Sequence, residues 1–157
     1  MSLSTKEELV KPVKNELEKV EIELKNYSNL AYPLINEINL DLHESRGKRI
    51  RPAVLFLVSK LCGVGGDEVV KLGTVVELLH VATLVHDDII DKAYLRRGQA
   101  SVNSQWGSEI SVLMGDWMYM TAFQIALELR SLRILDVLIE LTRTMVAGEM
   151  MQLDLDR

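Results

Sequence analysis

The spacing of apolar residues is the feature that most constrains the fold of this chain. Apolar side chains recur at intervals of three and four residues, rather than of two, through nearly the whole sequence. Only three prolines and nine glycines interrupt this pattern. The sequence therefore predicts an all-α protein.

About six helices are expected. The first is predicted over residues 5–26, where Pro12 marks either the true helical start near Lys11 or a kink. The others are predicted over residues 32–43, 52–62, 67–91, 109–129 and 132–156. Residues 92–107 have no apolar period, which predicts a long loop, and long loops in compact domains are usually functional or disordered.

Composition narrows the class of protein. With 157 residues, 48% of them hydrophobic, the chain can bury the core of one domain. A net charge of −5 argues against a nucleic-acid-binding protein, and a single cysteine excludes a disulfide framework. No stretch reaches the roughly 18 uninterrupted apolar residues of a membrane span, and no secretory signal opens the chain. We expect a cytoplasmic protein whose residues 1–4 are an expression remnant.

Three acidic residues gather at the C-terminal end of the helix predicted over residues 67–91. Asp87 and Asp91 are four residues apart and share one helical face, and Asp88 lies beside them. These carboxylates repel one another and oppose the helix dipole, so the arrangement favours a hard cation such as Mg²⁺. His80 and Thr83 are expected on the same face. A solvated acidic helix end and a buried core histidine are the alternatives.

Two basic clusters accompany the acidic one. Lys48 and Arg51 lie where a turn enters a helix, a position suited to binding an anion. Arg96 and Arg97 follow the aspartates in the predicted loop and could clamp phosphate oxygens. Solvated charged turns are the alternative for both clusters. Two cationic sites and one carboxylate face together suggest two phosphorylated ligands, only one of them bound through a metal.

These elements, in this order, resemble the trans-type polyprenyl diphosphate synthases. The similarity rests on Gly47-Lys48-Arg49-Ile50-Arg51-Pro52, His80, Asp87-Asp88-Ile89-Ile90-Asp91 and Arg96-Arg97-Gly98. Gly115-Asp116 and the stretch over residues 148–153 also resemble that family. The likeness extends from Tyr32 onward and implies an antiparallel helical bundle of the isoprenoid synthase type.

The resemblance also implies roles for particular residues. Asp87 and Asp91 would bind Mg²⁺ with support from Asp88, and Arg96 would contact the allylic diphosphate. Isopentenyl diphosphate would be bound without metal by a second set: Lys48, Arg51, His80 and Arg97. Glu149 and Gln152 would face the metal-bound diphosphate, although a glutamate on a helix surface is an equally good interpretation. A homodimer with a lipophilic product is expected.

Product length depends on the space beside the helix that carries Asp87. Thr83 and Ala82, four and five residues before Asp87, are both small, where short-chain relatives carry aromatic residues. We therefore expect a long-chain all-trans polyprenyl diphosphate. A short-chain synthase making a C15 or C20 product is disfavoured.

The family's second aspartate-rich motif is not found in these 157 residues. We therefore expect the N-terminal half of a single polyprenyl synthase domain, inactive on its own. A non-catalytic or partial helical subunit of a heteromeric prenyl synthase is the alternative from another class.

Overall fold

The computed structural model describes residues 8–28, 32–44 and 47–155. It confirms the all-α prediction. A 3₁₀ turn, η1 (Lys11–Val13), precedes the helices α2 (Lys14–Ser28), α3 (Pro33–Glu44), α4 (Ile50–Leu61), α5 (Asp67–Ile90), α6 (Val102–Trp106), α7 (Ser108–Glu128) and α8 (Leu132–Leu155). Between α5 and α6 lies a hairpin of two short strands, β1 (Leu95–Arg96) and β2 (Gln99–Ala100). The prediction for residues 1–4 lies outside the described residues.

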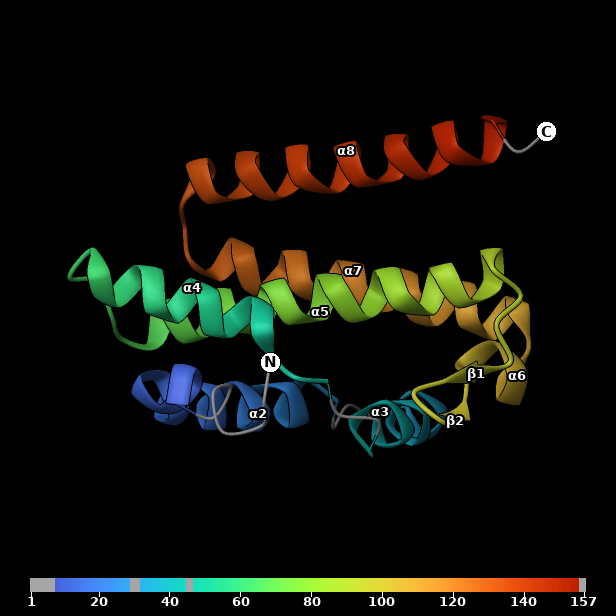
Figure 1. Ribbon diagram of the computed structural model, residues 1–157, viewed down its shortest axis with the longest axis horizontal. Helices are drawn as coiled ribbons and strands as arrows, with labels where there is room; N and C mark the ends of the chain where they lie inside the picture. Colours follow the sequence, from blue (N-terminus) through green and yellow to red (C-terminus); the bar gives the residue numbers. More distant parts are fainter. Residues whose placement is uncertain (1–7, 29–31, 45–46, 156–157) are drawn as a thin grey trace.

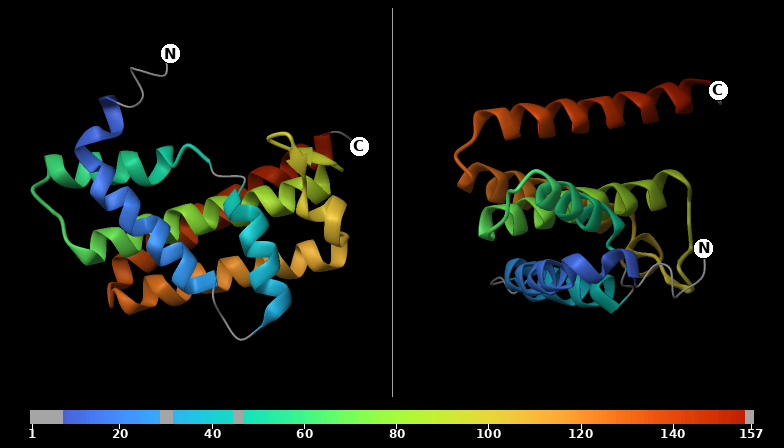
Figure 2. Two further views of the ribbon diagram at one scale, coloured as in Figure 1. Left: turned by 90° about the horizontal axis from the view of Figure 1, so that it is seen from below. Right: turned by 60° about the vertical axis from the view of Figure 1, so that its left-hand side comes forward.

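Helix α5 is the central element. It packs antiparallel against α7 along most of its length, and α2 and α4 cover other parts of it (Figure 1). Helix α3 crosses near the hairpin and α6, at the end where α5 finishes (Figure 2). This arrangement brings the N-terminal basic turn and the C-terminal end of α5 to one side of the molecule.

Two buried clusters hold these helices together. The larger joins α2, α4, α5 and α7, and includes Val20, Phe56 and Leu79. Phe56 packs directly onto α5 at Gly73, where a Cβ atom would lie 2.4 Å from the aromatic ring. The smaller joins α3, α5, α6 and α7, and includes Ile38 and Ala82. Both clusters include buried apolar residues of α5, which therefore carries much of the core.

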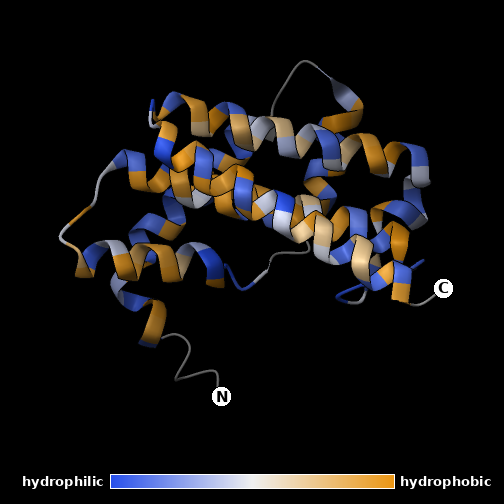
Figure 3. Cartoon of the chain, turned by 90° about the horizontal axis from the view of Figure 1, so that it is seen from above, coloured by the Kyte–Doolittle hydropathy of each residue, from blue (hydrophilic) through white to orange (hydrophobic). Residues whose placement is uncertain are grey.

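Helix α8 differs from the others because only Leu138 is fully buried along its length. It turns back over α7, contacts it sparsely, and extends away from the rest of the bundle (Figure 1). Apolar and polar residues are interspersed along it (Figure 3). Large apolar side chains such as Met150, Met151 and Leu155 are exposed.

By length and composition alone, α5 and α7 could each cross a membrane, although half of the relevant stretch of α5 and 44% of that of α7 lie buried in the protein. Core helices of soluble proteins have the same composition. The expected absence of a membrane span stays a prediction.

Pro12 interrupts the first predicted helix, which agrees with the second of the two alternatives expected for it: residues 8–10 are helical, and a 3₁₀ turn that contains Pro12 precedes α2. Another local prediction needs correction. The predicted loop over residues 92–107 is wrong, because this stretch contains the β1–β2 hairpin and α6. Arg97 and Gly98 both adopt positive φ, 54° and 82°, as a two-residue hairpin turn requires. Ser101 caps α6 by accepting a hydrogen bond from the Ser104 amide.

Candidate active site

The three aspartates at the end of α5 lie in different environments. Asp91 caps the helix and is exposed to solvent. Asp87 lines an apolar cavity between α5, α7 and α8. Asp88 is buried on the opposite side of α5, in a cavity that also contains His80. His80 and Asp87 were expected on one face of the helix. In the structure they line two different cavities, which α5 separates.

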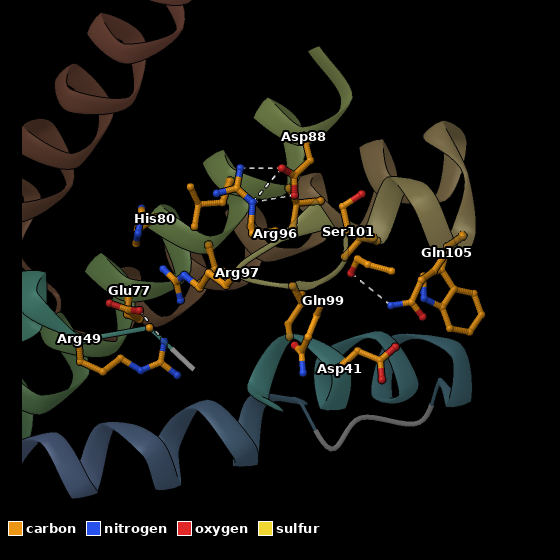
Figure 4. A pocket seen from close by; sticks show the side chains of 18 residues that line it. Asp41, Arg49, Glu77, His80, Asp88, Arg96, Arg97, Gln99, Ser101 and Gln105 are labelled. Carbon is orange, nitrogen blue, oxygen red and sulfur yellow. Dashed lines mark hydrogen bonds and ion pairs between the residues drawn. The ribbon is translucent and has the colours of Figure 1, made fainter. Parts of the chain in front are cut away.

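Asp88 makes an ion pair with Arg96 of strand β1. Its two carboxylate oxygens each accept a 2.8 Å hydrogen bond from Nε of Arg96, and Nη2 lies 2.6 Å from Oδ1 (Figure 4). The side chain of Asp88 is only 4% exposed. Hydrogen bonding to Asp88 raises the pKa of Arg96 above its usual value. Asp88 therefore holds the hairpin against α5.

Asp87 and Asp91 remain as carboxylates for a cation. Burial raises the pKa of Asp87, and the charges of Asp91 and Asp88 raise it further, while Arg96 opposes the change. A cation beside Asp87 would relieve this repulsion. Within the described part of the chain, no three His, Cys, Asp or Glu side chains meet closely enough to hold a metal. Two carboxylates one turn apart fit Mg²⁺, which usually keeps waters and takes other oxygens from a substrate phosphate.

A cationic pocket of about 330 Å³ lies at the start of α4. Its lining includes all four residues expected to bind a diphosphate without metal: Lys48, Arg51, His80 and Arg97. They come from the turn before α4, from α4, from α5 and from the hairpin turn. Gly47 leaves room for the Arg97 guanidinium, since a Cβ there would lie 2.7 Å from Nη1. The fold thus brings both basic clusters of the sequence together.

His80 is the uncharged member of this pocket. Burial lowers its pKa, and the nearby charge of Arg51 lowers it further, with smaller contributions from Arg97 and Arg96, although Glu77 acts in the opposite direction. The neutral imidazole is therefore favoured over the imidazolium in this pocket.

Sequence reasoning missed the role of Arg49, which lies between the two basic residues of the motif. Its guanidinium turns inward and bonds two glutamates, with Nε 2.6 Å from Oε1 of Glu21 and Nη1 2.5 Å from Oε1 of Glu77. Burial alone would lower its pKa, but the hydrogen bonds to Glu21 and Glu77 raise it. A run of basic residues does not indicate which one is buried. The hint available from the sequence was a charged residue, Glu77, within an apolar helix.

The pocket drawn in Figure 4 connects these groups. It has a volume of about 270 Å³ and lies between α3, α5, α6 and the hairpin. Arg49, Glu77 and His80 lie at one end, Arg97 and the Asp88–Arg96 pair in the middle, and Gln105 at the other end (Figure 4).

The apolar cavity beside Asp87 has a volume of about 650 Å³. Thr83 lines it, and Glu149 approaches from α8 on the opposite wall. Two expectations are not met in this structure. Ala82 is fully buried in the core cluster of α3, α6 and α7 instead of lining the cavity, because it lies on another side of α5. Gln152 is exposed on α8, away from the described walls of this cavity.

Comparisons with known proteins agree with this fold. The family model described as "Polyprenyl synthetase" matches residues 32–157. The chain therefore belongs to the polyprenyl synthetase family.

Curated relatives include enzymes named for both long and short products. An octaprenyl diphosphate synthase from Haemophilus influenzae is 35% identical over 153 residues, which cover 98% of this chain and 46% of the relative. A geranylgeranyl diphosphate synthase from Saccharolobus solfataricus is 38% identical over 105 residues, covering 67% of this chain and 32% of the relative. The chain spans about half the length of such relatives.

Solved structures are similar in fold over the same half. A decaprenyl diphosphate synthase from Rhodobacter capsulatus has a TM-score of 0.90 at 31% identity, with coverage of 95% of this chain and 46% of that one. A polyprenyl synthase from Caulobacter crescentus CB15, in complex with calcium and isoprenyl diphosphate, has a TM-score of 0.90 at 32% identity, with coverage of 94% and 45%.

Proposed function

We propose that this chain supplies the substrate-binding half of a Mg²⁺-dependent prenyltransferase. The enzyme would condense isopentenyl diphosphate with an allylic diphosphate into a long-chain all-trans polyprenyl diphosphate. The observation that carries the proposal is the convergence of Lys48, Arg51, His80 and Arg97, from four separate segments, on one pocket. His80 and Arg97 also line the neighbouring cavity that contains Asp88.

In this proposal the cationic pocket binds isopentenyl diphosphate without metal. Lys48, Arg51 and Arg97 neutralise its phosphate oxygens, and His80 donates a hydrogen bond. Because basic side chains neutralise this diphosphate, it needs no metal ion at this position.

The allylic diphosphate would be bound at Asp87 and Asp91 through Mg²⁺, which stabilises the charge that grows on the leaving diphosphate. Asp88 positions Arg96, which would contact the same diphosphate. Glu149 would face it from α8, whereas the exposed position of Gln152 supports a role only if α8 shifts. The apolar walls beside Thr83 exclude water from the reacting carbons and receive the growing tail.

The volume of this cavity and the small side chain of Thr83 support a long product. Curated relatives named as octaprenyl and nonaprenyl diphosphate synthases support the same assignment. The second aspartate-rich motif would come from the half of the fold that these 157 residues lack, so we expect the chain alone to be inactive. A homodimer in the cytoplasm is proposed on the family resemblance.

The test is to incubate the intact protein that contains these residues with labelled isopentenyl diphosphate, an allylic primer and Mg²⁺, and to size the lipid products. We expect long-chain products, lost in EDTA and in Asp87→Asn. Products of C15 or C20 would overturn the long-chain assignment, and absence of any prenyl product would overturn the enzymatic proposal.

A further inference from the structure

The buried cluster of Glu21, Arg49 and Glu77 lies directly beneath the cationic pocket. Arg49 and Glu77 belong to the pocket lining, yet the Arg49 side chain is only 11% exposed and that of Glu77 only 4%. Nη1 and Nε of Arg49 point to Glu77 and Glu21, and Nη2 lies 3.4 Å from the second oxygen of Glu21. The guanidinium therefore donates its hydrogen bonds to the carboxylates of Glu21 and Glu77.

This cluster connects the three segments that shape the pocket. Glu21 lies on α2, Arg49 immediately precedes α4, and Glu77 lies on α5 one turn before His80. Arg49 adopts the left-handed conformation, with φ of 48° and ψ of 35°, which is unfavourable for a residue with a side chain. Such a backbone conformation persists only where surrounding contacts stabilise it. The ion pairs of Arg49 with Glu21 and Glu77 provide such contacts.

The left-handed turn has a direct consequence for the neighbouring residues. Lys48 and Arg51 remain exposed at the pocket, while Arg49, between them in sequence, is turned into the protein. The distance between the ammonium of Lys48 and the groups on α4 and α5 thus depends on the backbone at Arg49.

We propose that Glu21, Arg49 and Glu77 are positioning residues for metal-free diphosphate binding, and that Arg49 is not itself a phosphate ligand. This inference rests on the proposed function of the pocket. It extends that function, because the cluster of Glu21, Arg49 and Glu77 would hold the segments that carry Lys48, Arg51 and His80 in place.

The competing interpretation, in which Arg49 binds phosphate directly, predicts different outcomes for two conservative substitutions. Lysine also binds phosphate, so Arg49→Lys would retain affinity if Arg49 were a ligand. A single ammonium cannot reproduce the forked bonds to two glutamates, so a positioning role predicts loss of affinity. Glu77→Gln removes a negative charge beside an anion site and would tighten binding if charge alone mattered. A positioning role predicts weaker binding.

The experiment titrates inorganic diphosphate into the intact protein that contains these residues, in EDTA, by calorimetry. For Arg49→Lys and Glu77→Gln we expect affinity to fall by about tenfold or more, as for other orienting partners. Glu18→Gln is the matched control, because Glu18 lies exposed on α2 and its ion pair is with Lys14, one turn earlier on the same helix. This variant should bind like the unmodified protein. Circular dichroism and thermal melts identify variants that fail to fold.

Glu21→Gln keeps the proposal testable if Glu77→Gln does not fold, because Glu21 is the more exposed partner of Arg49. In the intact protein the same substitutions should raise the KM for isopentenyl diphosphate and leave kcat nearly unchanged. Unchanged affinity in Arg49→Lys, or tighter binding in the glutamate variants, would overturn the positioning role alone. Absence of diphosphate binding by the unmodified chain would instead overturn the proposed pocket, and the inference with it.

Discussion

Single residues set the geometry at the end of α5. Gly115 on α7 lies against the His86 imidazole, and a Cβ there would lie 2.2 Å from Nε2. The His86 ring is held by Nε2 at 3.2 Å from the Val112 carbonyl oxygen and by a tilted contact with Tyr119. The absence of a side chain at Gly115 therefore allows α7 to approach the helix that carries Asp87.

Replacing this glycine tests the close approach. Gly115→Ala would force His86 out of its position, and we expect a loss of about 1–3 kcal/mol in the free energy of unfolding, measured by urea denaturation. Gly148→Ala is the control, because no heavy atom lies within 4 Å of its Cβ position on α8. That variant should gain roughly 0.5–1 kcal/mol from helix propensity. Equal effects at both positions would contradict the packing described.

His80 provides a pH-dependent readout of the cationic pocket. Its pKa is lowered by burial and by Arg51, so the unfolded chain binds the proton more readily and stability falls as pH drops below about 6.5. A diphosphate in the pocket would favour the imidazolium, so we expect the His80 pKa to rise when inorganic diphosphate is added. NMR titration of the His80 ring, with and without diphosphate, measures this pKa. The rise should vanish in a Lys48→Ala, Arg51→Ala double variant; its persistence there would place the anion elsewhere.

Residue types alone could predict which side chains of the site are chemically useful, but not where each one points. The basic motif and the aspartates were identifiable from their spacing. The division of labour between Asp87 and Asp88 was not, because it depends on the Arg96 guanidinium returning to α5 from the hairpin. The inward turn of Arg49 likewise depends on a backbone conformation that no residue type in the motif demands.

At the scale of elements, apolar periodicity was sufficient for the helices that carry the core. The predicted boundaries of α5, α7 and α8 agree with the structure to within one residue. The hairpin over Leu95–Ala100 was missed because its turn is Arg97-Gly98 and its two strands are only two residues long. The hairpin is held by tertiary contacts with α5, such as the Asp88–Arg96 ion pair, rather than by strand propensity.

The Asp88–Arg96 ion pair gives a test at this scale. Asp88→Asn should loosen the hairpin, so that amide hydrogen exchange across residues 94–101 speeds up by about tenfold or more, as expected from losing a charged hydrogen bond. Asp91→Asn is the comparison, because Asp91 is exposed at the helix end. If both variants exchange alike, the ion pair is not what holds the hairpin.

At the scale of the whole molecule, the apolar cavity between α5, α7 and α8 is the proposed path of the growing tail. A bulky side chain at Thr83 would close it, so Thr83→Phe in the intact protein should shift the products toward shorter chains, while Thr83→Val should not. Product sizing by chromatography measures this. An unchanged product range in Thr83→Phe would contradict the path.

Ala82 is the less informative position for such a test. Because it is fully buried in a packed cluster, Ala82→Phe would overpack the core and cost about 1–3 kcal/mol of stability. A change in product length would then be confounded with partial unfolding. Sequence spacing could not distinguish Ala82 from Thr83, since the two differ only in which side of α5 they occupy.

The central claim is that this half of the fold carries two diphosphate sites, one independent of metal and one dependent on it. The most direct measurement is a calorimetric titration of inorganic diphosphate into the intact protein that contains these residues, first in EDTA and then with Mg²⁺. We predict one site in EDTA, lost in the Lys48→Ala, Arg51→Ala double variant, and a second that needs Mg²⁺ and is lost in Asp87→Asn. Binding that requires Mg²⁺ throughout, or a single site abolished equally by both sets of variants, would contradict the account.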